Sequence, residues 1–206
     1  MLVRASFDDG TVQDLRVAEL VKKYGIETIF YWPFKPELVN EPNGRTSLSD
    51  NQMIELAKDF EIGSHTISHP LLTRIPLDQA RTEIEQSKIL LEDKFEQDIN
   101  SFCYPRGYSN PQVQEAVVEA GYLSARSTLV GYVHESENPF FEQTAVHVAC
   151  QRKEYAGVDW YDYGLELFEI AQNVPRSVFH IFGHSWEIDE NNQWGKFEEF
   201  LKAISK

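Results

Sequence analysis

The chain has 206 residues, 42% of them hydrophobic and 13% aromatic, which is enough to bury one sizeable core and excludes a largely disordered protein. Its formal net charge is −14 and the sequence has no basic cluster, which argues against nucleic acid and anionic membranes as partners. Its two cysteines imply no disulfide framework, and no segment approaches the length of a membrane span. The stretch Met1–Phe7 is too short, and the residues after it are too polar, for a signal peptide, so we expect a cytoplasmic protein that forms one domain over residues 1–206.

Short apolar runs, which predict strands, alternate along the chain with longer stretches of helical periodicity. In the first half, the predicted elements are a strand at Leu2–Phe7, a helix at Thr11–Tyr24, a strand at Ile26–Trp32, a loop at Pro33–Asn43, a helix at Asn51–Phe60 and a strand at Glu61–Ser64. In the second half, they are a helix at Leu77–Phe95, a strand at Ile99–Tyr104, a helix from Pro111 to Gly121, strands at Tyr122–Arg126 and Thr144–Cys150, a helix at Trp160–Gln172, a strand at Ser177–Phe182 and a helix at Trp194–Ile204. Repeated strand–helix units predict an α/β fold with parallel strands and outer helices, either an open doubly wound sheet or a barrel. Both architectures place the chemistry at the carboxyl ends of the strands.

The predicted strand ends carry the polar residues that point to a function. The first strand ends in Asp8-Asp9, and two adjacent carboxylates after an apolar run are costly unless a cation or a proton lies between them. The third strand ends before His65 and His69, whose spacing lets two imidazoles face one point, although surface or core histidines also occur at this spacing. Because Pro70 disfavours the α conformation at His69, we expect the pair on a loop or short turn and not inside a helix. A carboxylate with two imidazoles is the ligand set of a metal site with open positions.

Four motifs together resemble those of the polysaccharide deacetylases, the NodB-homology domain of carbohydrate esterase family four. They are Phe7-Asp8-Asp9-Gly10, then Gly63-Ser64-His65-Thr66-Ile67-Ser68-His69-Pro70, then Tyr104-Pro105-Arg106-Gly107, and a final strand that ends in His184. Their order and spacing match along nearly the whole chain, and the combination of the first two is highly specific. The resemblance implies a distorted (β/α) barrel of about seven strand–helix units and a single catalytic domain over residues 1–206.

The resemblance also implies a division of labour at the site. The metal ligands would be Asp9, His65 and His69, and the metal is usually zinc in relatives. Asp8 would be the general base that takes a proton from the attacking water, and His184 would be the general acid that protonates the departing amine. A backbone N–H at about Arg106 would hold the oxyanion that forms on attack.

The sequence departs from many relatives at the residue that pairs with the base. Those relatives have an arginine at the position of Cys103, whereas a large branch of the family carries it after the following strand, where Arg126 stands here. We therefore expect Arg126 to pair with Asp8 and to keep it ionised at neutral pH. A surface arginine without this role is the alternative.

The sequence leaves the partner of His184 open. Relatives often place an Asp and a Trp near the acid histidine, but Asp159-Trp160 comes late in the chain, so Glu187 is the nearer candidate. For substrate binding we expect the third motif and an aromatic wall after the final strand, which together are Tyr104, Pro105, Arg106, Gly107 and Trp186. Of the remaining histidines, we expect solvent exposure or a core hydrogen bond for His134 and His147 and a structural position for His180.

These observations favour a metal-dependent hydrolase that removes an N-acetyl group from an amino sugar, with Zn²⁺ as its cofactor. The lack of a secretion signal and the short loops favour a small or precursor substrate, such as a nucleotide- or lipid-linked sugar or a surface-polysaccharide intermediate. The alternative within enzymes is another amide C–N hydrolase of the family, a deformylase or a ureide hydrolase. The alternative outside enzymes is a catalytically silent sugar-binding protein, but binding alone would need neither Asp8 nor His184.

Overall fold

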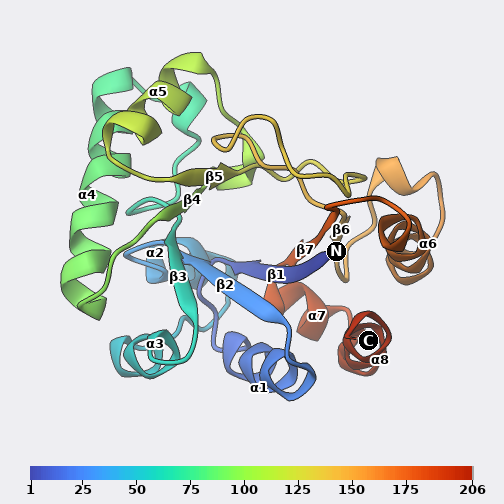
Figure 1. Cartoon of the computed structure of the whole chain (residues 1–206). Helices are drawn as coiled ribbons and strands as arrows, with labels where there is room; N and C mark the ends of the chain where they lie inside the picture. Colours follow the sequence, from blue (N-terminus) through green and yellow to red (C-terminus); the bar gives the residue numbers. More distant parts are fainter. Residues whose placement is uncertain (206) are drawn as a thin grey trace.

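The computed structural model describes residues 1–205 and contains a seven-stranded sheet, parallel throughout, that curls into a partial barrel (Figure 1). The strands are β1 (Leu2–Asp8), β2 (Glu27–Trp32), β3 (Glu61–Ser64), β4 (Ser101–Cys103), β5 (Ser124–Arg126), β6 (Val146–His147) and β7 (Val178–Gly183). Their order across the sheet is β5-β4-β3-β2-β1-β7-β6. Strands β2 to β5 follow one another in chain order on one side of β1, whereas on its other side the chain reaches the edge strand β6 first and then returns to β7 beside β1. The expected distorted (β/α) barrel is confirmed.

Helices cover the outer side of the curled sheet. The α-helices are α1 (Asp14–Tyr24), α2 (Glu37–Asn40), α3 (Asp50–Ala57), α4 (Leu77–Phe95), α5 (Pro111–Glu119), α6 (Trp160–Gln172), α7 (Ser185–Glu190) and α8 (Trp194–Ile204). Figure 1 shows α4 and α5 beside the strands β3 to β5, whereas α1, α8 and α6 follow the sheet round to β6. Across residues 1–205, no helix combines the length and the apolar character that a membrane crossing requires.

Local signals in the sequence set most helix boundaries. Helices α4, α6 and α8 have the predicted bounds. Helix α1 ends at Gly25, whose φ of 64° is the left-handed conformation that glycine adopts without strain. Helix α3 begins with a capping box in which Ser49 and Gln52 satisfy each other's backbone N–H groups, and the side chain of Asn110 caps α5.

Two predictions about elements are wrong, and one helix was missed. The segment Pro33–Asn43 is not a plain loop, because it holds α2 and the 3₁₀ turn η1 (Glu41–Asn43), which prolines can begin since their φ already suits a first helical turn. The strand predicted at Thr144–Cys150 shrinks to Val146–His147, and Ala149 has a left-handed φ of 58° that ends the extended backbone. Helix α7 was not predicted, because six residues are too few to show helical periodicity.

The two faces of the sheet have different chemistry. On β1, Ala5 and Phe7 belong to the main apolar core beneath the helices, whereas Ser6 and Asp8 alternate with them and face the inside of the curl. Inside the curl, Ser6 Oγ lies 2.9 Å from Nε2 of the buried His180, which is a structural position as expected. The inner face is therefore polar, and its upper edge, at the carboxyl ends of the strands, holds the predicted site.

Candidate active site

The end of β1 delivers the two adjacent carboxylates in different directions. Asp8 is the last residue of the strand and is 1% exposed, so its side chain lies inside the curl. Asp9 leaves the strand with a left-handed φ of 78°, a conformation that costs a non-glycine residue on the order of 1–3 kcal/mol. This turn separates the two carboxylates, although their residues are neighbours in the sequence.

Asp8 forms a buried ion pair with Arg126, as predicted. Nη2 of Arg126 donates to Oδ1 and Oδ2 of Asp8 at 2.5 and 2.6 Å, and neither side chain is more than 2% exposed. The guanidinium also lies over the rings of Tyr31 and Phe182, 5.0 and 4.8 Å from their centroids. Burial opposes ionisation of Asp8, but Arg126, with smaller contributions from nearby histidines, brings the pKa of Asp8 below its ordinary value. Asp8 is therefore a carboxylate at neutral pH.

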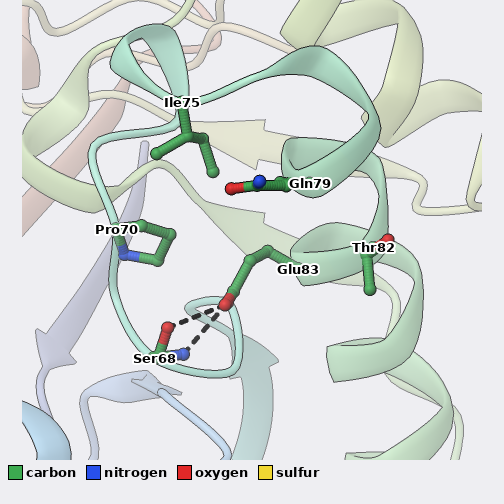
Figure 2. A pocket seen from close by; sticks show the side chains of 6 residues that line it. All are labelled: Ser68, Pro70, Ile75, Gln79, Thr82 and Glu83. Atoms are coloured by element: carbon green, nitrogen blue, oxygen red, sulfur yellow. Dashed lines mark hydrogen bonds between the residues drawn. The ribbon is translucent and has the colours of Figure 1, made fainter.

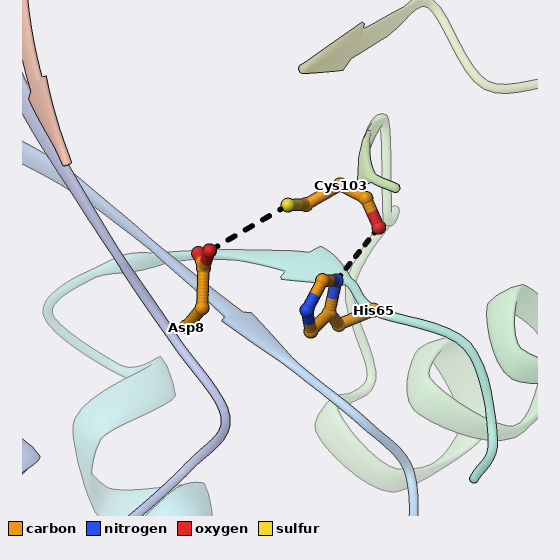
Figure 3. A group of neighbouring side chains, drawn as sticks. All are labelled: Asp8, His65 and Cys103. Atoms are coloured by element: carbon orange, nitrogen blue, oxygen red, sulfur yellow. Dashed lines mark hydrogen bonds between the residues drawn. The ribbon is translucent and has the colours of Figure 1, made fainter. Parts of the chain in front are cut away.

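Cys103 contacts both Asp8 and the first histidine of the pair, as Figure 3 shows. Its Sγ lies 3.7 Å from Asp8 Oδ2, and Nδ1–H of His65 donates to its carbonyl oxygen at 2.7 Å. Burial raises the pKa of the Cys103 thiol well above its ordinary value, so it stays protonated and is a poor metal ligand. The hydrogen bond fixes the tautomer of His65 and leaves its Nε2 as the lone-pair atom.

The two histidines lie on the segment that follows β3, which we call the histidine loop (residues 65–70). No helix forms there, and both Thr66 and His69 have left-handed φ values, 71° and 58°. Thr66 Oγ1 accepts a hydrogen bond from the backbone N–H of His69 at 2.9 Å, which closes the loop on itself. The expectation that the pair lies on a turn after a strand is confirmed.

Glu83 of α4 fixes the outer side of the histidine loop (Figure 2). Its Oε2 accepts from the backbone N–H groups of Ile67 and Ser68 at 2.8 and 3.0 Å, and its Oε1 accepts from Ser68 Oγ at 2.7 Å. A charged acceptor with three donors forms strong hydrogen bonds. The loop is thus held from α4 on one side and from Cys103 on the other.

Asp9, His65 and His69 converge on one point. Asp9 Oδ1 lies 3.8 Å from His65 Nε2 and 3.6 Å from His69 Nε2, and it is buried without a hydrogen-bond partner. Burial is the main cause that lowers the pKa of both imidazoles, to about 4 for His69, so both are neutral. An unpartnered buried carboxylate oxygen that faces two neutral imidazoles fits a divalent cation, because without a cation this buried oxygen has no partner for its negative charge.

His184 lies on the opposite side of Asp9 and is held by Glu187. Glu187 Oε2 accepts from His184 Nδ1–H at 2.8 Å and from His147 Nε2–H at 2.6 Å. His184 Nε2 is left facing the site, 3.8 Å from Asp9 Oδ2. Burial disfavours the charged imidazole, but Asp9 and Glu187 outweigh it and raise the pKa of His184 to about 9. Glu187 is thus the partner that the sequence left open, and Asp159 instead caps α6.

These side chains surround a cavity of about 430 Å³ at the carboxyl ends of the strands. It is lined by Asp8, Asp9, Val39, Asn43, Arg45, His65, His69, Arg106, Thr128, His147, Arg152, Phe182 and His184. Among the residues expected to bind substrate, only Arg106 reaches this wall. The Tyr104 hydroxyl donates to the Phe140 carbonyl away from the cavity, and Pro105 is buried. Trp186 contacts the ring of His184 and donates from Nε1 to Asp9 Oδ2 at 3.3 Å, so it supports two residues of the site without lining the cavity itself.

Gly107 has a packing role beside the cavity. It has a φ of 73°, and a Cβ added there would lie 2.1 Å from Oγ1 and 2.7 Å from the backbone N of Thr128. Only glycine therefore allows η3 (Pro105–Gly107) to pack against the segment that follows β5.

Among the cavity residues that the sequence reasoning missed, three have basic side chains, which are His147, Arg45 and Arg152. His147 was expected to be exposed or to form a core hydrogen bond, and it is buried and hydrogen-bonded, but its partner is the carboxylate that orients His184. The two arginines lie in segments without periodicity or motif, so no signal in the sequence marks them. His134, by contrast, is exposed.

Comparison with known proteins decides the family. Residues 2–125 match the family model of the polysaccharide deacetylases, which is more than half of the chain. The chain belongs to the polysaccharide deacetylase family. A putative polysaccharide deacetylase of Bacillus subtilis, YxkH, is 30% identical over 132 residues, which cover 63% of this chain and 45% of that protein. The match therefore spans less than half the length of this curated relative.

Solved structures of this family share the fold. A putative polysaccharide deacetylase from Mycobacterium smegmatis superposes with a TM-score of 0.72 at 12% identity, over 99% of this chain and 83% of that one. The Streptococcus pyogenes deacetylase PplD, in complex with acetate, has a TM-score of 0.60 at 21% identity, over 68% of this chain and 62% of that one. The resemblance inferred from the four motifs is confirmed, while the roles of individual residues stay predictions.

Proposed function

We propose that this polysaccharide deacetylase is a metal-dependent hydrolase that removes the N-acetyl group of an amino sugar. Membership of the family supports the deacetylation of an acetylated saccharide. The observation that carries the metal dependence is the buried, unpartnered Oδ1 of Asp9 between His65 and His69. These three residues would hold a divalent cation, and the ligand set of two imidazoles and one carboxylate suits Zn²⁺. When bound, such a cation supplies Lewis acidity, which makes water a stronger acid and withdraws electrons from an amide carbonyl.

Asp8 is suited to be the general base. Arg126 keeps it ionised, and it lines the cavity beside the metal ligands, so it can take the proton of an attacking water. Because Arg126 holds both carboxylate oxygens, the carboxylate cannot rotate away from the cavity. The attack adds the water oxygen to the acyl carbon, and the backbone N–H of Arg106, a residue that lines the same cavity, would stabilise the negative charge on the former carbonyl oxygen.

His184 is suited to be the general acid. Glu187 binds its Nδ1–H and raises its pKa, so Nε2 carries a proton that can pass to the amide nitrogen as the C–N bond breaks. The products are acetate and a free amino sugar, and the proton from water remains on Asp8 until it is lost to solvent. A cavity of about 430 Å³ lies within the range of small-ligand sites, which suits a nucleotide- or lipid-linked sugar or a short polysaccharide intermediate.

Metal analysis combined with an acetate assay tests this proposal. We expect about one Zn²⁺ per chain by elemental analysis, and loss of acetate release when a chelator removes it. Asp9→Asn should lose metal and turnover together, whereas Asp8→Asn should keep the metal and lose turnover. Undiminished hydrolysis without metal, or formate in place of acetate, would favour another amide hydrolase of the family. Sugar binding without any hydrolysis would favour a silent binding protein.

A further inference from the structure

Three arginines line the cavity beside the proposed metal site, and we call them the arginine wall (Arg45, Arg106 and Arg152). Arg45 follows η1, Arg106 belongs to η3, and Arg152 precedes the 3₁₀ turn η4 (Lys153–Tyr155). The fold thus brings together three guanidinium groups that are more than 40 residues apart in the chain. This is a local concentration of positive charge in a protein whose formal net charge is −14.

The carboxylates of the cavity lining do not cancel the charge of the arginine wall. Asp8 is already neutralised by Arg126, and Asp9 is assigned to the cation, so the cavity lining offers no further carboxylate. Outside the lining, Glu190 Oε1 accepts from Arg45 Nε at 3.1 Å and Glu154 Oε2 lies 3.6 Å from Arg152 Nε, so each of these two arginines also has one ion-pair partner. Arg106 is exposed, and it has no ion pair among residues 1–205.

Two of the three guanidinium groups are held in place before any ligand binds. Arg45 lies over the ring of Trp186, 3.2 Å from its centroid. Arg152 donates to the Thr128 carbonyl oxygen at 3.1 Å and to Nδ1 of His147 at 3.4 Å. Such pre-organisation lowers the entropy that binding must remove.

The arginine wall continues into a second cavity. Arg106, Thr128 and Arg152 also line a neighbouring space of about 460 Å³, to which Lys153 and the largely exposed Tyr108 contribute. A ligand whose acetamide lies at Asp9 and His69 can therefore extend past two guanidinium groups without leaving the hollowed surface.

We propose that the arginine wall binds an anionic group of the substrate, so that the deacetylated molecule is an acidic saccharide and not a neutral one. This inference rests on the proposed deacetylase function and names its substrate class. Guanidinium groups match phosphate and carboxylate oxygens by paired, charge-assisted hydrogen bonds. The overall negative charge of the protein repels anions at long range, so an acidic substrate requires fixed positive groups of this kind at the site.

Calorimetric titration of the zinc-loaded protein with three small probes tests the inference. The probes are N-acetylglucosamine, N-acetylglucosamine 1-phosphate, and a disaccharide of N-acetylglucosamine with glucuronic acid. We expect at least one charged probe to bind about tenfold more tightly than the neutral sugar, which is the size of effect that hydrogen bonds to charged groups contribute. Tight binding of the phosphate alone would indicate a phosphorylated sugar, and tight binding of the uronate alone an acidic polysaccharide unit.

Variants assign this preference to the arginine wall. In the double variant Arg106→Gln, Arg152→Gln the Kd of the neutral sugar divided by that of the tighter charged probe should fall to near one. The single variant Arg152→Lys should retain part of this preference for the charged probe. Arg81→Gln is the matched control, because it removes one positive charge from the outer face of α4, where Arg81 pairs with Glu119. Equal affinity for charged and neutral probes, or a preference that survives in the double variant or is lost equally in the control, would overturn the inference.

Acetate release, measured in parallel, separates this inference from the proposed function. Charge-dependent binding without acetate from any probe would refute the deacetylase proposal and leave the anion site standing. Acetate release from all probes with equal kcat/KM and equal Kd would support the deacetylase and refute the anion site.

Discussion

Replacement of Arg126 by methionine is the most direct test of the charge arrangement inside the barrel. Methionine fills part of the same space between Tyr31 and Phe182 but leaves Asp8 as a buried carboxylate without a cation. Removing one member of a buried ion pair costs about 3–5 kcal/mol of unfolding free energy. Since both side chains are almost fully buried, water cannot take over the role of the guanidinium, and we expect a loss in that range at pH 7.

The pH dependence of this loss has a definite sign. In the native wild-type protein the pKa of Asp8 lies below 3.8, so the ion pair stabilises the fold above that pH and its contribution disappears as the pH falls through the native pKa. In Arg126→Met burial dominates and raises the pKa of Asp8, so the stability of the variant falls as the pH rises above 3.8. The difference in stability between the two proteins should therefore shrink from pH 7 toward pH 4.

Urea unfolding of metal-free protein at several pH values measures these differences. Asp8→Asn in the Arg126→Met background should restore most of the lost stability, because it removes the unpaired charge. The control is Arg81→Gln, an exposed pair for which we expect a change below about 1 kcal/mol. If Arg126→Met were as stable as the wild type, or if its pH–rate profile were unchanged, the pairing would not serve to keep Asp8 ionised.

Three further predictions concern residues around the site. Glu83→Ala should weaken zinc binding about 10- to 100-fold, because Glu83 holds the loop that carries two metal ligands. Competition with a chelator measures this affinity, and Glu85→Ala, on the exposed face of the same helix, is the control that should leave it unchanged. Glu187→Gln should lower the pKa of His184 from about 9 in an NMR titration of the metal-free protein and reduce kcat; an unchanged titration would mean that Glu187 does not tune the acid. Burial raises the pKa of Asp14 to about 7 in the native state, so as the pH rises Asp14 ionises in the unfolded chain before it ionises in the native protein. The free energy of unfolding should therefore fall between about pH 4 and pH 7. Asp14→Asn should remove this decrease in unfolding free energy, which amounts to up to about 4 kcal/mol, as measured by urea unfolding. If the pH dependence were unaltered in the variant, another group would be responsible for it.

The sequence predicted the parts of the molecule that local chemistry determines. Helices α4, α6 and α8 were correct to the residue because each carries its own periodicity. The pairing of Arg126 with Asp8 was predicted as well, but from the resemblance to the family branch that carries an arginine after this strand and not from the residues alone. Short elements escaped prediction, because α2 and α7 have too few residues to display a pattern.

Contacts between distant loops could not be predicted from one sequence. The bond from His147 to Glu187 joins β6 to α7, and both elements are defined by tertiary packing more than by propensity. In the same way, the arginine wall exists only because three loops meet at one end of the barrel. The sequence showed no basic cluster, whereas the folded chain has one at the cavity.

The left-handed conformations of Asp9, Thr66 and His69 have a consequence for how this protein can change. Each residue holds a backbone shape that glycine would adopt at lower energy, by on the order of 1 kcal/mol or more. Selection for thermal stability alone would therefore favour glycine at these positions. At Asp9 and His69 that change would delete a ligand, so screens for heat resistance should yield inactive survivors there. At Thr66 glycine would keep every ligand, and it would remove a buried side chain whose hydroxyl accepts from the His69 N–H, so Thr66 is the one position of the three where a more stable protein could remain active.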